Sequence, residues 1–132
     1  MVAEQKCLYQ QREDGIHQFT FLDASREAVR EFVTQLETIY TNTPLDKHVH
    51  LYLDTSALKA GPPLRQIARQ ITPFFQEFPE RPEGSLAIIT ARGSVFTMLG
   101  NFLNLFSRSK DRFKLFREGQ EDEAIRWLLA VR

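Results

Sequence analysis

The sequence has few of the features that mark several large classes of protein. Among its 132 residues it contains one cysteine, Cys7, so no disulfide can form within the chain and a reducing compartment is favoured. No signal-peptide core follows the N-terminal residues, and no window has the unbroken apolar run of a membrane span. Lysine plus arginine and aspartate plus glutamate each number 17, so the basic excess typical of nucleic-acid-binding proteins is missing. These absences predict a cytoplasmic protein that does not bind nucleic acid.

Sequence signatures of catalysis and of metal binding are also scarce. Ser94 follows Gly93, but the segment Arg92–Phe96 lacks the second glycine of Gly-x-Ser-x-Gly, so Ser94 is interpreted as a helix N-cap. His48 and His50 are two apart in a predicted strand and should point to one face. They could share a metal ion there, but no further ligand is evident, and a polar strand face or a strand edge explains them without a metal. We therefore expect no catalytic residue, no metal and no cofactor, and the protein is not expected to be an enzyme.

The elements that are present predict one α/β domain. Apolar residues make up 42% of the chain, enough for a single core over residues 1–132. Residue periodicity and turn signals predict the order β-β-α-β-α-β-α-β-α. Strands are expected over 6–11, 16–22, 48–54, 86–89 and 113–116. A first helix is expected after residues 23–25 and should end at 42–44, and a second should open at 61–63 and carry its apolar stripe to 78. A third should run over 94–107, and a fourth should begin at 121. Because the later strands need crossover connections, we expect a mixed, mostly parallel sheet of about five strands, with an N-terminal hairpin and about four covering helices.

Particular residues define the ends and faces of these helices. Asp23 or Ser25 should cap the first helix. Pro73 lies inside the apolar stripe of the second and predicts a kink or a break there. In the last helix we expect three apolar residues to face inward, while the single tryptophan lies off that stripe. These are Ile125, Leu128 and Leu129, with Trp127 outside.

The order of elements and three segments of the chain resemble the STAS domain, the module of sulfate-transporter tails and of anti-sigma-factor antagonists. The segments are His50–Ser56, Ser85–Thr90 and Glu121–Leu128. The chain is most similar to the divergent branch that resembles stage II sporulation protein AA, which is grouped with CRAL-TRIO lipid carriers as STAS/Sec-fourteen-type proteins. The resemblance covers nearly the whole chain. It implies a STAS-like domain that regulates by docking to a protein partner.

The same resemblance bears on how such docking is controlled. The anti-sigma-factor antagonists carry a phosphorylatable serine in an Asp-Ser-Ser-Gly segment at the start of their second helix. The matching stretch here, residues 58–64, has no hydroxyl side chain, and Thr55 and Ser56 lie earlier, at the end of the preceding strand. The resemblance therefore implies the docking role without the phosphoserine switch.

Polar groups near the ends of two predicted strands form a candidate anion site. The residues after the later of these two strands lie at a helix N-terminus, where free backbone N–H groups favour an anion. If the two strands are neighbours, both groups meet at the carboxyl edge of the sheet, the usual ligand crevice of open α/β sheets. Ordinary capping of strand ends explains the same residues. They are Asp54, Thr55 and Ser56 in the first group and Thr90, Arg92 and Ser94 in the second.

The predicted helix over 94–107 carries apolar residues around about half of its circumference. A basic segment follows, because residues 91–117 hold six basic groups and one acidic group. Residues 1–60, by contrast, hold six basic groups and nine acidic groups. Burial in the core or in a homodimer is one interpretation. The other is contact with a hydrophobic ligand or an anionic membrane surface, which would make the protein a carrier or sensor of a lipid and is the alternative to docking on a protein partner. The residues expected to form this ligand or partner surface are Phe96, Met98, Leu99, Phe102, Leu105, Arg108 and Lys110.

Overall fold

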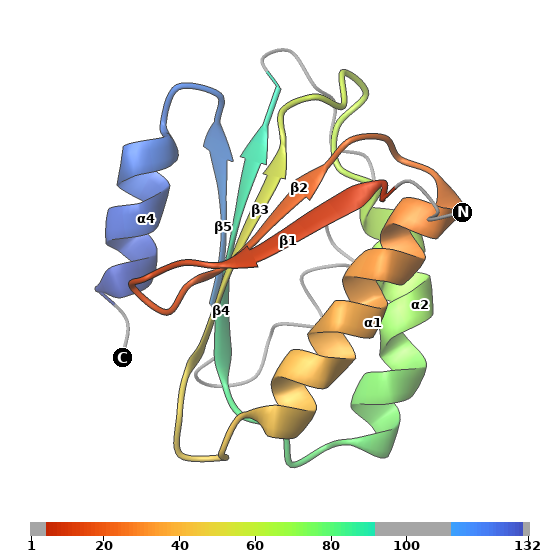
Figure 1. Ribbon diagram of the computed structural model, residues 1–132, viewed down its shortest axis with the longest axis vertical. Helices are drawn as coiled ribbons and strands as arrows, with labels where there is room; N and C mark the ends of the chain where they lie inside the picture. Colours follow the sequence, from red (N-terminus) through yellow and green to blue (C-terminus); the bar gives the residue numbers. More distant parts are fainter. Residues whose placement is uncertain (1–4, 92–111, 131–132) are drawn as a thin grey trace.

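The computed structural model describes residues 5–91 and 112–130, which form a five-stranded sheet with helices on both faces (Figure 1). The strands lie in chain order, β1-β2-β3-β4-β5. β1 and β2 are antiparallel, and β2 to β5 are parallel to one another. The strands are β1 (Cys7–Gln11), β2 (His17–Phe21), β3 (Val49–Thr55), β4 (Gly84–Thr90) and β5 (Arg112–Arg117). The predicted α/β class and the mixed, mostly parallel sheet are confirmed.

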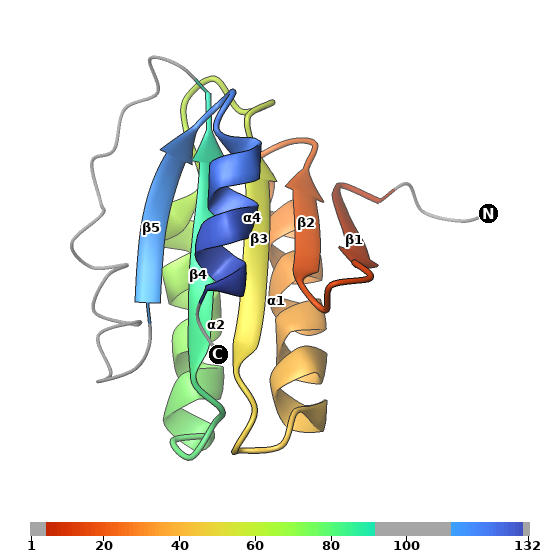
Figure 2. The ribbon, with the colours of Figure 1, turned by 90° about the vertical axis from the view of Figure 1, so that its left-hand side faces the viewer.

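Three helices are described, and they divide between the two faces of the sheet. α1 (Arg26–Asn42) and α2 (Leu64–Glu77) lie side by side on one face, and α4 (Glu121–Leu129) covers the other (Figure 2). α1 connects β2 to β3 and α2 connects β3 to β4, so both crossovers pass over the same face, as expected when successive crossovers share one handedness. The predicted helix over 94–107 lies outside the described residues. Among those described, no helix has the length and apolar composition needed to cross a bilayer.

The hairpin between β1 and β2 forms where the Asp-Gly signal predicts it. Gly15 has a φ of +90°, a conformation that side chains with a Cβ disfavour. The Asp14 carboxylate accepts a hydrogen bond from the Ile16 backbone N–H at 3.1 Å, and the Arg12 N–H donates to the Ile16 carbonyl at 2.8 Å. The turn therefore fixes the register of the first strand pair.

α1 follows the sequence signals closely. Ser25 is its N-cap, and the Ser25 hydroxyl accepts a hydrogen bond from the Ala28 N–H at 3.1 Å. Asp23 supports this cap by accepting from the Ser25 N–H at 2.9 Å. The whole predicted apolar stripe of this helix is buried: Val29, Phe32, Val33, Leu36, Ile39 and Tyr40.

α2 does not break at Pro73, so of the predicted kink or break the break is wrong, while the kink stays a prediction. The helix continues from Leu64 to Glu77 with the proline inside it. A proline removes one backbone hydrogen bond, but the apolar stripe persists on both sides of it, with Ile71 and Phe75 buried against the sheet. Packing of that stripe outweighs the local cost of the proline.

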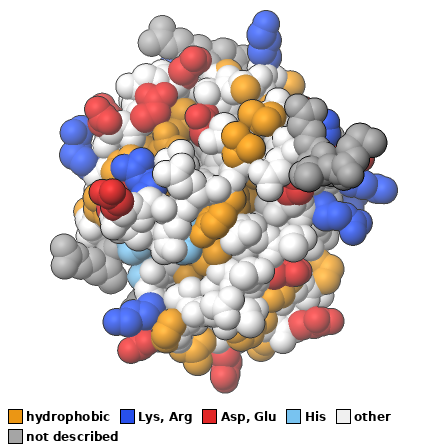
Figure 3. Space-filling model, viewed as in Figure 1, with side chains coloured by type: hydrophobic (Ala, Val, Ile, Leu, Met, Phe, Trp, Pro, Cys, Tyr) orange, Lys and Arg blue, Asp and Glu red, His pale blue; other side chains and the backbone are white. Residues whose placement is uncertain are grey.

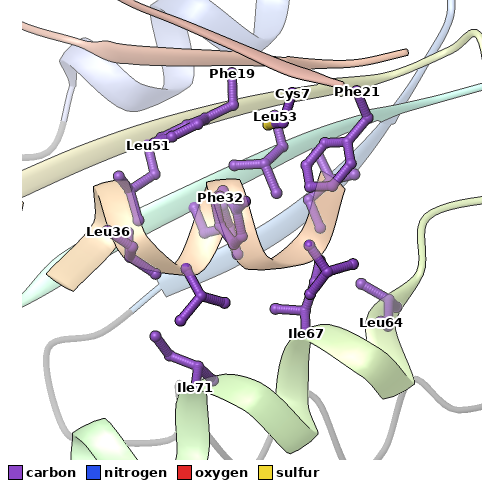
Figure 4. Close-up of a cluster of buried hydrophobic side chains, with 14 of the residues drawn as sticks. Cys7, Phe19, Phe21, Phe32, Leu36, Leu51, Leu53, Leu64, Ile67 and Ile71 are labelled. Carbon is purple, nitrogen blue, oxygen red and sulfur yellow. The ribbon is translucent and has the colours of Figure 1, made fainter. Parts of the chain in front are cut away.

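The main core lies between the sheet and the pair α1 and α2 (Figure 4). Phe19 and Phe21 of β2 point down onto Phe32 of α1, and the rings of Phe19 and Phe32 meet edge to face at 4.8 Å. Ile67 and Ile71 of α2 complete this layer from below. Every residue of β4 is buried, as its continuous apolar run predicts for a central strand covered on both faces.

A smaller cluster lies under α4 on the opposite face. Ala124 and Leu128 are fully buried there against Tyr52, Ile89 and other residues of the sheet. Two predictions for this helix are wrong. Leu129, expected to face inward, is 39% exposed. Trp127, placed off the buried stripe, packs on this cluster, and its ring lies 6.0 Å from that of Phe116.

Candidate functional site

The carboxyl edge of the sheet brings together four of the six residues predicted to bind an anion. Thr55 and Thr90 are directly paired in the register of β3 and β4, so the two strands are neighbours as the prediction required. Asp54 and Ser56 adjoin Thr55 at the same edge. Arg92 and Ser94, the other two predicted residues, lie outside the described part of the chain.

The threonine hydroxyls at this edge hydrogen-bond to the sheet itself. The Thr55 hydroxyl donates to the Ile89 carbonyl at 2.7 Å, and the Thr90 hydroxyl donates to the Phe116 carbonyl at 3.1 Å. Both residues are buried, with 0% and 2% of their surface exposed. Each hydroxyl therefore ties its own strand to the next one and has no proton left to donate to a ligand.

Asp54 and Ser56 form a local turn at the end of β3. One carboxylate oxygen of Asp54 accepts hydrogen bonds from the Ser56 N–H at 2.9 Å and from the Ser56 hydroxyl at 2.6 Å. This is the side-chain turn that aspartate makes with its own backbone two residues on. The anion site at this edge stays a prediction, and the described polar groups have the geometry of structural caps.

The electrostatic environment on the α4 side of this edge is acidic. Burial, followed by the charges of Asp54 and Glu121, raises the pKa of Tyr52 to about 12. Asp122 adds to this effect, while Arg12 opposes it. A negative potential around the tyrosine disfavours an anion on this side of the sheet.

The three histidines of the chain gather at the opposite, amino end of the parallel strands. The rings of His48 and His50 lie 4.9 Å apart, so they share a face as their spacing predicts. His17 of β2 shares a hydrogen bond with the Tyr9 hydroxyl at 2.8 Å. Burial, and then the charge of His50, lowers the pKa of His17. Figure 3 shows the histidine atoms, in pale blue, close together on this side of the molecule.

These histidines do not form a metal centre with the other described side chains. In the described ranges, no three His, Cys, Asp or Glu residues are grouped so that they could hold a metal ion. The two imidazoles on one face instead pack against each other, and His48 bonds to a serine. A polar strand face, the alternative that the sequence left open, describes this arrangement.

The pairing of His48 with Ser85 is a contact that sequence reasoning missed. The His48 Nε2 and the Ser85 hydroxyl oxygen are 2.7 Å apart, the distance of a serine nucleophile and its base. Ser85 is fully buried, however, with 0% of its surface exposed, so a substrate has no access to the hydroxyl. The two residues are 37 positions apart, and only the parallel register of β3 and β4 brings them together.

The thiol of Cys7 is equally protected. The side chain is buried at the start of β1, and burial together with the charge of Glu31 raises its pKa to about 12. Glu31 is held beside it by accepting hydrogen bonds from the Lys6 and Cys7 N–H groups, both at 2.9 Å. A thiol with such a pKa is protonated at neutral pH and is a poor nucleophile.

A groove of about 770 Å³ lies on the outer surface of the helical layer, between α1 and α2. The apolar and basic surface predicted from the sequence, with Phe96, Met98, Leu99, Phe102, Leu105, Arg108 and Lys110, lies outside the described residues. The groove was not predicted, although the two arginines four residues apart in α1 were a visible signal. Its lining is Arg26, Arg30, Val33, Thr34 and Glu37 from α1, with Gln66, Arg69, Gln70 and Pro73 from α2.

Comparison of the chain with models of known protein families, with curated proteins and with solved structures finds no match. The resemblance to the STAS domain therefore rests on the sequence segments and the order of elements alone.

Proposed function

We propose that the protein is a cytoplasmic, non-catalytic docking module of the STAS type that regulates by binding a protein partner. One observation carries the proposal: the described side chains best suited to covalent chemistry are buried and held within the fold. Ser85 and Thr55 are fully buried and hydrogen-bonded, and the Cys7 thiol is buried and protonated at neutral pH. The STAS-like element order, with its N-terminal hairpin and parallel strands, supports the assignment to this class.

The proposed module lacks the phosphoserine switch of the antagonists. The Thr55 hydroxyl is inaccessible to a kinase because the residue is fully buried and donates to the Ile89 carbonyl. The Ser56 hydroxyl is committed to the Asp54 carboxylate at 2.6 Å. In the loop that follows, residues 58–64 contain no serine or threonine. Control of docking by a phosphate at this place is therefore not part of the proposal.

The test is affinity capture with the full chain from an extract of its source cells, followed by reconstitution with the purified captured protein. The proposal expects a complex of defined stoichiometry by size-exclusion chromatography with light scattering. It also expects Ser56→Asp, which mimics a phosphoserine, to bind the same protein with unchanged affinity. The proposal would be contradicted if no protein were captured, or if none of the captured proteins formed a complex with the purified chain. A lipid that co-purifies in native mass spectrometry would favour the alternative carrier function.

A further inference from the structure

The groove between α1 and α2 is strongly basic at one end. Arg26 and Arg30 are one helical turn apart in α1, and Arg69 faces them from α2. All three are exposed, and none makes an ion pair or hydrogen bond with another residue that the structure describes. Like charges four residues apart on a helix repel one another. The three arginines therefore gather positive charge at this end of the groove, and no ion pair among the described residues involves them.

The helix axes add to this positive potential. α1 and α2 run in the same direction beside each other, and both begin at the carboxyl end of the parallel strands (Figure 1). Arg26 is the first residue of α1, and Gln66 is the third residue of α2. The positive ends of both helix dipoles lie at the arginine end of the groove, where they favour negative charge.

The shape and lining of the groove suit a polypeptide. It extends along α1 from Arg26 to Glu37, about three helical turns or 16 Å. Thr34 and Gln70 offer hydroxyl and amide groups that can pair with the N–H and C=O groups of a peptide. The Gln66 amide donates to the Ala24 carbonyl at 3.3 Å, and its oxygen can still accept from a peptide N–H. The basic groups stand on both walls of the groove, two on α1 and one on α2, so a segment that lies between the helices can meet all three.

We propose that this groove binds an acidic segment of the partner protein, with carboxylates seated on Arg26, Arg30 and Arg69. Arg26 and Arg30 are separated by about 6 Å along the helix axis. Carboxylates at positions i and i+4 of an acidic helix, or i and i+2 of an extended strand, repeat at nearly the same distance. Glu37 at the far end of the groove sets the direction of the segment, because it favours a basic residue there. The inference rests on the proposed docking function and names the surface and the chemistry of that docking.

The groove is tested with a 12-residue capped peptide of alternating Glu-Glu and Ala-Ala pairs, titrated into isotope-labelled protein and followed by NMR. The expected result is a set of shifts confined to α1, α2 and the three arginine side chains, with an affinity that weakens as salt is added. The triple variant Arg26→Gln/Arg30→Gln/Arg69→Gln should lower the affinity about tenfold. All three residues are exposed, so the variant keeps its fold, which a thermal melt verifies.

A matched control removes the same number of charges elsewhere. Arg112→Gln/Arg117→Gln/Arg126→Gln changes three exposed arginines of β5 and α4, outside the groove. This control should bind the peptide as the wild type does. Equal loss in both triple variants, shifts outside the groove, or equal binding of a peptide with Gln in place of Glu would each overturn the inference. Tighter binding of inorganic tripolyphosphate than of the peptide at the groove would also overturn it, and would make the ligand a phosphate compound.

The captured partner separates this inference from the proposed function. If the groove variant retains the partner at wild-type affinity, the acidic-segment inference fails while the docking function stands. If no protein reconstitutes with the wild type, the docking function fails, and the peptide titration still decides whether the groove binds acidic polypeptide.

Discussion

The two faces of the sheet differ in their cover and in their chemistry. Among the described residues, twenty buried side chains form the cluster between the sheet and the pair α1 and α2, whereas seven form the cluster under α4. The α4 face also carries the polar contact between His48 and Ser85 and the acidic surroundings of Tyr52. Since hydrophobic stabilisation scales with the apolar area removed from water, the α1 and α2 face should hold most of the stability. The α4 face can then accommodate polar groups.

The largest expected effect comes from the sheet face covered by α1 and α2, called the thick face below; the face covered by α4 is called the thin face. Phe32→Ala should lower the free energy of unfolding by about 3–5 kcal/mol, because it removes a ring that is 2% exposed and packs on both Phe19 and Phe21. Chemical denaturation measures the change. The control is Leu22→Ala at a side chain 49% exposed, which should alter stability by less than about 0.5 kcal/mol. Similar values for the two variants would remove the basis of the comparison.

On the thin face, Leu128→Ala should cost about 2–3 kcal/mol, less than Phe32→Ala. Leu128 is fully buried, but α4 is a nine-residue helix, so the space left can partly collapse. Denaturation of both variants under the same conditions gives the ranking. A larger loss for Leu128→Ala would show that α4, despite its size, holds the sheet together.

The sequence predicted the thick face better than the thin one, and the reason is physical. α1 is a long amphipathic helix whose stripe has one possible partner, so its buried residues were predicted correctly, and Ser25 is one of the two caps that the sequence offered. α4 is short, so whether its last turn contacts the sheet decides whether Leu129 or Trp127 is covered. The break predicted at Pro73 does not occur because the packing of α2 on both sides of it outweighs a local propensity.

Contacts that depend on strand register could not be predicted from sequence patterns. His48 and Ser85 meet only because β3 and β4 align in parallel, which no local spacing encodes. The groove between α1 and α2 likewise combines residues of two helices, and its basic character emerges only when Arg69 is placed opposite Arg26 and Arg30. At the carboxyl edge, the adjacency of Thr55 and Thr90 was predicted from topology, but the direction of their hydroxyls was not.

A third prediction sharpens the packing of the thick face at its amino end. A Cβ added at Gly84 would lie 2.9 Å from the Tyr40 hydroxyl oxygen and 3.3 Å from the Val49 carbonyl oxygen, closer than such contacts normally are. Gly84→Ala should therefore cost about 1–2 kcal/mol. In a Tyr40→Phe background the cost should fall, because the closest atom has been removed. A cost that is unchanged in that background would place the strain on the Val49 backbone instead.

The smallest expected effect is on pH dependence at the histidine group. The pKa of His17 is lowered from 6.5 by burial and by His50, so the unfolded chain binds its proton more readily than the folded protein does. This contribution to stability is complete above pH 6.5 and is lost as the pH falls from 6.5 through the lower folded pKa. Denaturation at pH 7.5, 6.5 and 5.5 should show a smaller loss for His17→Gln than for the wild type.

The pH range in which His17 affects stability is separate from the range in which the carboxylates do. Asp23, whose pKa is lowered from 3.8 mainly by its hydrogen bonds with Ser25, contributes a loss only at still lower pH. That acidic loss should remain in His17→Gln. Identical slopes between pH 7.5 and 5.5 in variant and wild type would show that His17 protonates equally easily in the folded and unfolded states.

The order of the strands has a consequence for how the protein is made. Each strand pairs with the one synthesised just before it, so a chain emerging from the ribosome can add β2, β3, β4 and β5 one after another to a growing edge. No strand has to be inserted between two that are already joined. Vectorial synthesis and the final topology thus follow the same path, and the open edge at each stage is the template for the next piece of chain.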